Sequence, residues 1–569
     1  MTPVSARASR TRVLRILAAV VASMMMLRLG GVGEAWFPSV GVLAATLVIL
    51  LVLARTNGDH WRQTVRCLEA HRFETGLLFV VLLAVVLRLP GLSGELGHTP
   101  IDMDENRLAS NVQHFFITGD LQHETVEHYP GVVFWLFVAG SFIGYVKELS
   151  RGLSVRPDQL PVELFVQWAR LCNVLVGAGI VASAGSIGRR LVGARAGLVA
   201  AVIVAIAPLS IETTTLVRND PGMVLAVMAT VYLSLVSLDS PRARWVIAAG
   251  ALAGVATAIK YSSVFAIVPA VMGAAFRGSY GHRVQRVALT LLAFVVAVAV
   301  TNHFVWSDFP TFLKQLADQV EITNRRHWAA TSNPAAFYVA ILDRFGTGLP
   351  LLWLAAAFAV YGLCAGGTRS LVFLSFPLLY IWFMTVRPAQ FPRWVFPMLP
   401  FVAIGGAGAL AAIWRLPSVV SVPASPWRAP AARAVTVIVL VLALWFPVKA
   451  GTVSFSRRVT SPTYALVEHW LELHAAPQSV VILETGWLDL HRSPVVVRRV
   501  PDLKALLDGG IEQLAGAQWL IVPEPRFGHS TLTHLGLVQR VHASQGFRGA
   551  LGYDYEIYAV PSVPPPEAR

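Results

Sequence analysis

The sequence predicts a polytopic α-helical membrane protein that ends in a small α/β domain, and three observations support this fold class. Of the 569 residues, 55% are hydrophobic and only 14% are charged, whereas soluble domains carry about 25% charged residues. Apolar runs of about 17–25 residues, the length that a helix needs to cross a bilayer, recur as far as residue 450. After residue 451, short strand-like runs alternate with helical ones.

Arginine-rich loops predict the orientation of these helices, because cytoplasmic loops carry an excess of Lys and Arg. The first 15 residues contain four arginines and no acidic residue, which places the N-terminus in the cytoplasm. The basic loops 277–286 and 415–433 then fall on the same side. About thirteen spans are predicted, at residues 14–33, 37–54, 77–93, 166–187, 195–215, 221–238, 245–259, 262–276, 287–303, 348–366, 370–386, 394–414 and 434–450.

The apolar segment 130–147 is expected to lie along the outer membrane surface instead of crossing. If it crossed, Asp220 would lie inside and the arginines at 189–195 would lie outside, against the positive-inside rule. Its Trp135 and Tyr145 also suit an interfacial helix, because aromatic side chains concentrate at the membrane–water interface.

Three domains follow from this topology. Residues 1–76 form an N-terminal transmembrane hairpin with a cytoplasmic loop, 77–450 form the transmembrane core, and 451–569 form an extracytoplasmic α/β domain with a disordered tail. The outer loops of the core cover residues 94–165, 214–221, 303–346 and 387–394. In the last domain, strands are predicted at 480–484, 495–500 and 519–522, and helices at 464–474 and 503–514.

Composition argues against several other classes of function. The net charge of +14 does not indicate a nucleic-acid partner, because the arginines sit in short loops between apolar runs. The three cysteines lack metal-ligand spacing. His114, His123 and His128 are nine and five residues apart, which fits no compact zinc pattern. No metal or other cofactor is therefore predicted.

Acidic residues gather where the chain is predicted to leave the membrane. Residues 101–130 follow the apolar run 77–92 and contain Asp104 and Glu105, and ionisable residues at a membrane are costly and commonly functional. A carboxylate can deprotonate a hydroxyl nucleophile, and Lys and Arg can bind a phosphate and stabilise it as it leaves. The topology brings further polar residues to the same outer face, namely His128, Tyr129, Arg218, Asp220, Lys260, Tyr261, Arg387 and Arg393.

An ordered set of short motifs resembles the class C glycosyltransferases of the protein O-mannosyltransferase and lipid A aminoarabinose transferase superfamily. The motifs cover roughly residues 77–415. They are Asp104-Glu105, Gly119-Asp120, Tyr129-Pro130, Ala169-Arg170-Leu171, residues 188–193, Asp220-Pro221, residues 254–261 and residues 393–400. Two features depart from the family pattern: an extra helical hairpin precedes the core, and Pro130-Gly131 stands where the family usually has Pro-Pro.

The resemblance implies a membrane enzyme that uses a polyprenyl-phosphate sugar. Asp104 would be the general base, Glu105 its orienting or substrate-binding neighbour, and Asp220 would help to orient acceptor or donor. Lys260 and Arg393 would bind the lipid phosphate. Further contacts to phosphate or sugar would come from His128, Tyr129, Arg218, Tyr261 and Arg387. Some related oligosaccharyltransferases use a divalent cation, so the resemblance leaves open a metal-dependent alternative.

Each of these candidates also has a purely structural explanation. Asp104, Glu105 and Asp220 could cap helices. Lys260 and Arg393 could simply extend their charged groups to the membrane surface. The resemblance favours the catalytic and phosphate-binding roles.

The predicted activity is transfer of a monosaccharide, mannose- or arabinose-like, from a polyprenyl-phosphate donor to a hydroxyl of an acceptor protein, lipid or glycan. It would take place at the outer face of a bacterial cytoplasmic membrane, with inversion. The alternative function is a transporter or flippase for a lipid-linked sugar, which would require charges within helices and paired broken helices. Here the charges lie at helix ends and no internal repeat is found. A non-catalytic scaffold for the C-terminal domain would not require the outer polar cluster.

Overall fold

The computed structural model describes most of the helical core and of the C-terminal domain. Two compact units divide the chain, Met1–Phe79 and Val80–Arg569, and the candidate site lies in the second. The predicted helices 14–33 and 37–54 lie outside the described residues, as do His128 and Tyr129. The described residues are 71–92, 103–120, 131–150, 156–160, 162–302, 304–324, 332–419, 428–459, 463–484, 495–500, 503–508, 510–524, 535–541, 544–545, 548–549 and 554–560.

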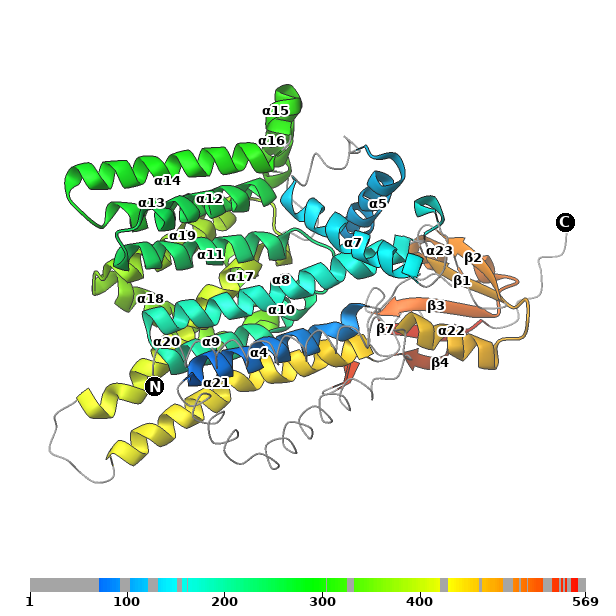
Figure 1. Cartoon of the computed structure of the whole chain (residues 1–569). Coiled ribbons are helices and arrows are strands. Elements are labelled where there is room, and N and C mark those ends of the chain that lie inside the picture. Colours follow the sequence, from blue (N-terminus) through cyan, green and yellow to red (C-terminus); the bar gives the residue numbers. More distant parts are fainter. Residues whose placement is uncertain are drawn as a thin grey trace, which may run out of the picture. The chain divides into compact units, whose positions relative to one another are not determined.

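The core consists of helices, of which α8, α9, α11, α12 and α14 lie side by side in Figure 1. The α-helices of the core are α4 (Arg72–Arg88), α5 (Met103–Thr118), α7 (Val132–Ser150), α8 (Val162–Leu191), α9 (Ala194–Ile206), α10 (Pro208–Thr213), α11 (Asp220–Asp239), α12 (Ala243–Ile259), α13 (Ile267–Ala275), α14 (Tyr280–Thr301), α15 (Phe304–Ser307), α16 (Phe309–Asn324), α17 (Pro334–Ile341), α18 (Leu349–Cys364), α19 (Thr368–Val386), α20 (Leu399–Val419) and α21 (Arg428–Val459). Shorter helical turns are η1 (Leu89–Leu92), η2 (Pro157–Gln159), η3 (Tyr261–Ala266), the π-helix η4 (Leu342–Gly346) and η5 (Pro392–Met398).

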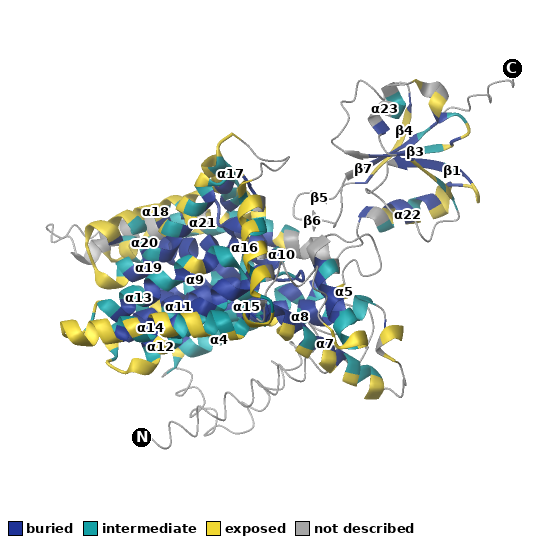
Figure 2. Ribbon diagram, turned by 90° about the horizontal axis from the view of Figure 1, so that it is seen from above, coloured by how far each residue is buried: buried dark blue, intermediate teal, exposed yellow. Residues whose placement is uncertain are grey.

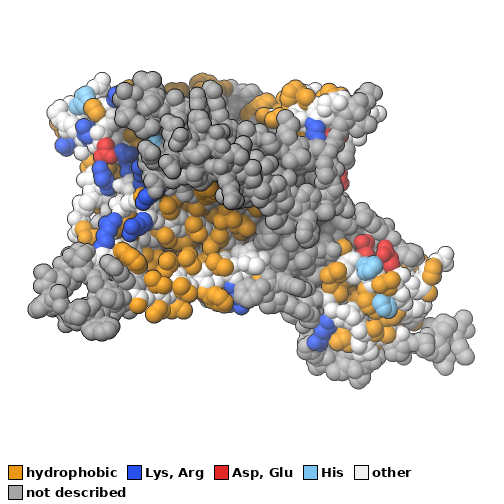
Figure 3. All heavy atoms as spheres, turned by 60° about the horizontal axis from the view of Figure 1, so that its bottom comes forward, with side chains coloured by type: hydrophobic (Ala, Val, Ile, Leu, Met, Phe, Trp, Pro, Cys, Tyr) orange, Lys and Arg blue, Asp and Glu red, His pale blue; other side chains and the backbone are white. Residues whose placement is uncertain are grey.

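Seven helices in the described part of the chain are long and apolar enough to cross a membrane. The pair Pro334–Gly346 and Leu349–Cys364, bent by 119°, makes an eighth if it is one span. Figure 3 shows a face on which hydrophobic side chains gather. These observations confirm a mostly helical fold with helices long and apolar enough to span a membrane, whereas the count of about thirteen spans stays a prediction. The interfacial placement of α7 also stays a prediction, because by length and composition this helix is one of the seven.

The predicted continuous helix at 195–215 is wrong, because a break divides it. Helix α9 ends at Ile206, and Ala207 adopts an extended backbone (φ −60, ψ 127) before α10 begins with Pro208. The residue before a proline is disfavoured in the helical conformation, and proline itself suits the first position of a helix. The dipeptide Ala207-Pro208 therefore ends one helix and starts the next.

Small residues allow the central helices to approach closely. A Cβ atom on Gly250 of α12 would lie 2.2 Å from the Thr290 carbonyl oxygen of α14, and one on Gly254 would lie 2.4 Å from the Phe294 carbonyl oxygen. On the other side of the core, Gly188 of α8 meets the Gly197 Cα of α9 in the same way. Backbone-to-backbone contact of this kind replaces the hydrophobic driving force that is missing between helices in lipid.

The extent of burial distinguishes the inner helices from the outer ones. Figure 2 shows α9 and α11 mostly buried, while α14 exposes apolar side chains such as Leu292 and Val300.

At the end of α11 opposite Asp220, Asp239 accepts from Arg190 of α8 at 2.5 Å and from Arg369 of α19 at 2.7 Å. This shared carboxylate connects three helices that lie far apart in the sequence.

The C-terminal domain is a mixed five-stranded sheet with the order β2-β1-β3-β7-β4. Strand β1 pairs in parallel with β2 and β3, whereas β7 is antiparallel to β3 and β4. The predicted strands at 480–484, 495–500 and 519–522 and the predicted helix at 464–474 agree with β1, β2, β3 and α22, whereas β4 and β7 were not predicted. The predicted continuous helix at 503–514 is wrong, because it is divided into α23 and the short turn η6. The elements are α22 (Thr463–His474), β1 (Val480–Glu484), β2 (Val496–Val500), α23 (Leu503–Asp508), η6 (Ile511–Leu514), β3 (Trp519–Glu524), β4 (Gly536–Val541), β5 (Ser544–Gln545), β6 (Arg548–Gly549) and β7 (Asp554–Ala559).

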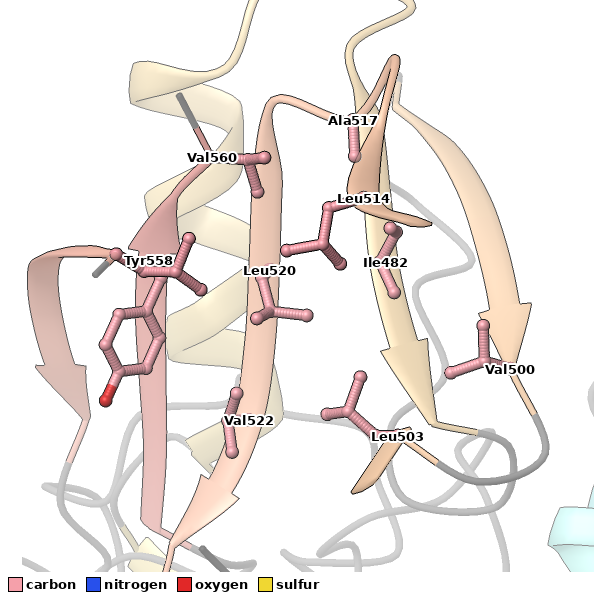
Figure 4. Close-up of a cluster of buried hydrophobic side chains, with 10 residues drawn as sticks. Ile482, Val500, Leu503, Leu514, Ala517, Leu520, Val522, Tyr558 and Val560 are labelled. Carbon is pink, nitrogen blue, oxygen red and sulfur yellow. The ribbon is translucent and has the colours of Figure 1, made fainter. Parts of the chain in front are cut away.

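Alternation along each strand gives this sheet two buried faces. In β1, Val481 and Leu483 pack with α22, whereas Ile482 faces the cluster formed with Leu503 and Leu514. Figure 4 shows this second cluster, with helix α22 on the opposite side of the strands. The period of two in the side-chain direction thus accounts for a three-layer α/β domain.

The glycine contacts in the core make a testable prediction. Gly250→Ala should destabilise the protein by about 1–3 kcal/mol or more, because its Cβ would overlap the Thr290 carbonyl oxygen. The matched control is Gly281→Ala in α14, whose Cβ would meet no atom within 4 Å. Thermal unfolding in detergent measures both variants, and equal transition temperatures for the two would contradict this packing.

Candidate functional site

A buried ion pair joins the first acidic segment to the core. Arg170 on α8 donates from Nε and Nη2 to the two carboxylate oxygens of Glu105 on α5, at 2.7 and 2.6 Å. The side chains of Arg170 and Glu105 are only 3% and 7% exposed. Arg170 also donates to the Gly91 carbonyl at 2.9 Å. This two-bond geometry is the strong, directional form of a carboxylate–guanidinium contact, and it fixes the start of α5.

The same ion pair reaches the second acidic segment. The Glu105 carboxylate accepts a third hydrogen bond from the backbone amide of Val217 at 2.9 Å. One turn further along α8, Asn173 donates to the carbonyls of Leu216 and Arg218 at 2.7 and 2.9 Å. Helix α8 therefore holds the backbone that leads into Asp220, through two polar side chains spaced three residues apart.

A second buried arginine, Arg88, binds the part of the chain that comes just before Val217. Arg88 at the end of α4 is fully buried and donates to Ser210 Oγ at 2.8 Å and Thr214 Oγ1 at 2.7 Å. It also donates to the carbonyls of Ala84 and Ala205, at 2.8 and 3.1 Å. A buried charge requires such a set of hydrogen bonds to be tolerated. The break at Ala207 exposes the helix-end carbonyl that Arg88 uses.

Asp220 and Lys260 form the ion pair at the centre of the candidate site. Lys260 Nζ donates to Asp220 Oδ1 at 2.7 Å, with side-chain exposures of 25% and 7%. Asp220 is the first residue of α11, so its negative charge lies at the positive end of the helix dipole. Lys260 follows the last residue of α12 in an extended conformation, which directs the chain out of the helix. Two helix ends thus meet through one ion pair.

Two further cations act on the same carboxylate. The positive charges of Arg393 on η5 and of Arg218 both stabilise the ionised form of Asp220, in addition to Lys260. Residues that lie 175 positions apart along the chain are therefore brought together, as the topology predicted. Cations that gather at helix ends in this way suit an anionic ligand such as a phosphate.

Helix α16 connects two other predicted residues. The ring of its Phe312 contacts Tyr261, with centroids 6.2 Å apart, and Tyr261 Oη also accepts from Asn302 Nδ2 at 3.3 Å. At its other end, Asn324 accepts from Arg387 Nη1 at 2.6 Å. Arg387 therefore bonds to α16 and lies over the ring of Phe383.

The start of α7 is wedged between two helix ends that carry site residues. A Cβ on Gly131, which has φ +50, would lie 1.9 Å from the Thr301 carbonyl oxygen at the end of α14. Val133 in turn meets Gly222, two residues after Asp220, so that a Cβ there would lie 2.7 Å away. The glycine of Pro130-Gly131, where the family usually has proline, is thus required by a close backbone contact.

The structure changes the local interpretation of three predicted residues. Helix α5 begins at Met103, so Asp104 and Glu105 both lie in its first turn instead of preceding it. Asp220 is inside α11, and the capping position falls to Asn219, whose side chain makes no capping bond. Glu105 is fully engaged by Arg170 and Val217. The side chain of Asp104 lies outside the described part.

Arg88, Asn173 and Asn302 were not predicted as members of this site, and Arg170 was predicted only as part of a motif. Arg88 interrupts an apolar run without a nearby acid, which is a usable signal for a buried polar contact. Within the described residues, no group of three or more His, Cys, Asp or Glu side chains could hold a metal ion.

Residues 165–306 match the family model for dolichyl-phosphate-mannose-protein mannosyltransferase. The predicted resemblance to the class C superfamily is thereby confirmed. The matched segment contains Arg170, Asp220 and Lys260, so it includes both ion pairs described above except for Glu105. The match covers 142 of the 569 residues.

Similar solved structures include the archaeal oligosaccharyltransferase AglB from Archaeoglobus fulgidus in complex with an inhibitory peptide and a dolichol-phosphate. It is 11% identical with a TM-score of 0.49, over 80% of this chain and 70% of that one. ArnT from Cupriavidus metallidurans bound to undecaprenyl phosphate is 16% identical with a TM-score of 0.45, over 86% and 99% of the two chains. No curated protein matches the sequence significantly.

The Glu105–Arg170 pair makes the second testable prediction. Arg170→Met should lower the free energy of unfolding by about 3–5 kcal/mol, because it leaves the buried Glu105 charge uncompensated. The double variant Glu105→Gln/Arg170→Met should recover part of this loss, because neither charge is then buried alone. Denaturant unfolding of the two single variants and the double variant completes the cycle, and strictly additive losses would rule out the coupling.

Proposed function

We propose that this protein transfers a monosaccharide from a polyprenyl-phosphate donor to an acceptor hydroxyl at the outer face of the membrane, with inversion at the anomeric carbon. The observation that carries the proposal is the Asp220–Lys260 pair with Arg393 and Arg218 around it. Cations that converge at helix ends are suited to an anionic phosphate. The sugar is mannose- or arabinose-like, and the acceptor is a protein, lipid or glycan.

Lys260 and Arg393 bind the phosphate of the donor in this proposal. The Lys260 ammonium has three N–H donors, and Asp220 uses one of them at 2.7 Å. That bond holds the ammonium in place and leaves two donors for phosphate oxygens. A cation already fixed by a protein carboxylate needs little rearrangement when charge develops on the leaving group.

The reaction is a single displacement. The acceptor oxygen attacks the anomeric carbon while the bond from that carbon to the phosphate oxygen breaks. The electron pair leaves with the polyprenyl phosphate, whose charge Lys260 and Arg393 stabilise. The hydroxyl proton passes to Asp104 as general base. One displacement at one carbon inverts its configuration.

In this scheme, Glu105 positions Asp104 and does not itself react with the substrate. Its carboxylate is occupied by Arg170 and the Val217 amide, so it is not free to accept a proton from substrate. It holds the first turn of α5, in which Asp104 lies, at a fixed place relative to the segment before Asp220. Glu105 is therefore a positioning residue, whereas Asp104 is the catalytic one.

The lipid tail of the donor would approach through the bilayer beside α7. This helix exposes a set of large apolar side chains, Trp135, Leu136, Phe142, Ile143 and Val146. Its first residues contact the ends of α11 and α14. An apolar path that leads to these helix ends lets a lipid-linked donor arrive without crossing water. We place the enzyme in a bacterial cytoplasmic membrane, with its C-terminal domain outside.

Loss of the proposed base is the third testable prediction. Asp104→Asn should abolish sugar transfer while leaving donor binding within about twofold, because only the proton acceptor is lost. Asp158→Asn, which removes a half-exposed carboxylate paired with Arg156, is the control and should keep full activity. The assay incubates purified protein with a panel of polyprenyl-phosphate sugars and measures release and transfer. Normal transfer by Asp104→Asn would refute its role, and flipping of the donor without transfer would favour a flippase.

The phosphate-binding role of Lys260 is the fourth prediction. Lys260→Met should weaken binding of polyprenyl phosphate itself about tenfold to a hundredfold, because a charge-assisted contact is lost. Lys260→Arg should retain most of the affinity. Lys314→Met on α16 removes an exposed lysine and serves as the control. Unchanged binding of polyprenyl phosphate by Lys260→Met would exclude this assignment.

A further inference from the structure

Asn219, directly before Asp220, has a buried carboxamide that the fold leaves unpaired. The residue is only 3% exposed. In the part of the chain that the structure describes, neither its Nδ2 nor its Oδ1 has a hydrogen-bond partner. Two unpaired polar atoms on one buried side chain are rare, because each costs free energy that folding must offset.

The position of Asn219 does not account for this arrangement. Asn is common at the capping position of a helix because its side chain accepts from the exposed amides of the first turn. Asn219 occupies that position before α11, yet it makes no such bond, and its backbone is helical at φ −81 and ψ −22. By contrast, Asn333 before α17 accepts from the Ala336 amide at 3.0 Å. Asn219 thus lacks the usual structural reason for an asparagine.

The contacts on both sides of Asn219 hold it rigidly in this place. Asn173 fixes the carbonyl of Arg218 at 2.9 Å, and Lys260 fixes Asp220 at 2.7 Å. The carbonyl of Asn219 accepts from the Met223 amide at 3.1 Å, as the first bond of α11. These contacts fix the backbone from which the Asn219 side chain extends.

The chemistry of the carboxamide selects among the parts of the donor. A phosphate only accepts hydrogen bonds, so it could satisfy Nδ2 but would leave Oδ1 unpaired. A hydroxyl group both donates and accepts. Two neighbouring hydroxyls of a sugar can therefore satisfy both atoms at once, one donating to Oδ1 and the other accepting from Nδ2.

We propose that the Asn219 carboxamide binds two neighbouring hydroxyl groups of the donor's sugar and so determines which sugar the enzyme accepts. This inference rests on the proposed function. It places the sugar of the donor next to Asn219. Sites that hydrogen-bond a substrate hydroxyl discriminate strongly against analogues that lack it, because their own polar groups are then left unpaired.

The test compares wild type with Asn219→Leu, a variant that keeps the number and branching of the side-chain heavy atoms but has no polar atoms. Purified full-length protein is titrated with polyprenyl-phosphate hexoses and pentoses, with monodeoxy analogues of the tightest of these, and with polyprenyl phosphate alone. Asn219→Leu should bind the sugar-bearing lipid about tenfold to a hundredfold more weakly and polyprenyl phosphate equally well. Wild type should lose affinity for deoxy analogues at two adjacent positions, and the variant should show no such difference.

Two controls keep the result interpretable. Asn219→Leu should be at least as thermally stable as wild type, because two unpaired buried atoms are removed, and Asn219→Ala provides a second variant if it is not. Asn333→Ala removes a helix-capping asparagine and should leave every binding constant unchanged. One contrary result is that wild type binds the sugar-bearing lipids while Asn219→Leu distinguishes the deoxy analogues as well as wild type does. In that case an ordered water satisfies Asn219, and only this inference falls. If wild type binds none of the sugar-bearing lipids, the proposed function falls with it.

Discussion

The constraint on which the site depends is that a carboxylate buried against a membrane core must be satisfied in full. Glu105 achieves this with Arg170 and the Val217 amide. Each of these partners belongs to a different part of the chain, so satisfying one charge also aligns the first acidic segment, helix α8 and the second acidic segment. A Glu105 carboxylate with only some of these partners would be costly in free energy. The three parts of the chain are therefore expected to align together.

The same logic repeats at Arg88 and at Asp220. Arg88 binds carbonyls and hydroxyls on both sides of the break at Ala207, so the irregular backbone there is stabilised by a buried cation. Asp220 and Lys260 join the ends of α11 and α12. A single buried polar group would destabilise the fold. When such groups are paired, they fix the positions of helix ends that would otherwise be held only by packing. A rigid site on helix ends follows from this.

Hydrophobic periodicity and the arginine pattern were sufficient to predict the helical class and the strand at 480–484. They also predict a shared membrane face for Asp220, Lys260 and Arg393, which the structure brings close to one another. They could not predict contacts whose partners are far apart in sequence, such as Glu105 with Arg170 or Arg88 with Thr214. Strand β7 was missed because Glu556 interrupts its apolar pattern, although that carboxylate is buried and bonded to Tyr558 and Arg540. The sequence offered Asp220 as a possible helix cap, whereas the structure gives that position to Asn219, which makes no capping bond.

Charge balance explains why an acid belongs in a site that would bind an anion. Lys260, Arg218 and Arg393 all act on the carboxylate of Asp220, and a phosphate monoester carries about −1.5 to −2 near neutral pH. Without Asp220, the Lys260 ammonium would lose the carboxylate that holds it at a partly buried helix end. A neutral amide at Asn219 adds hydrogen bonding without disturbing that balance, which suits it to the uncharged part of the same ligand.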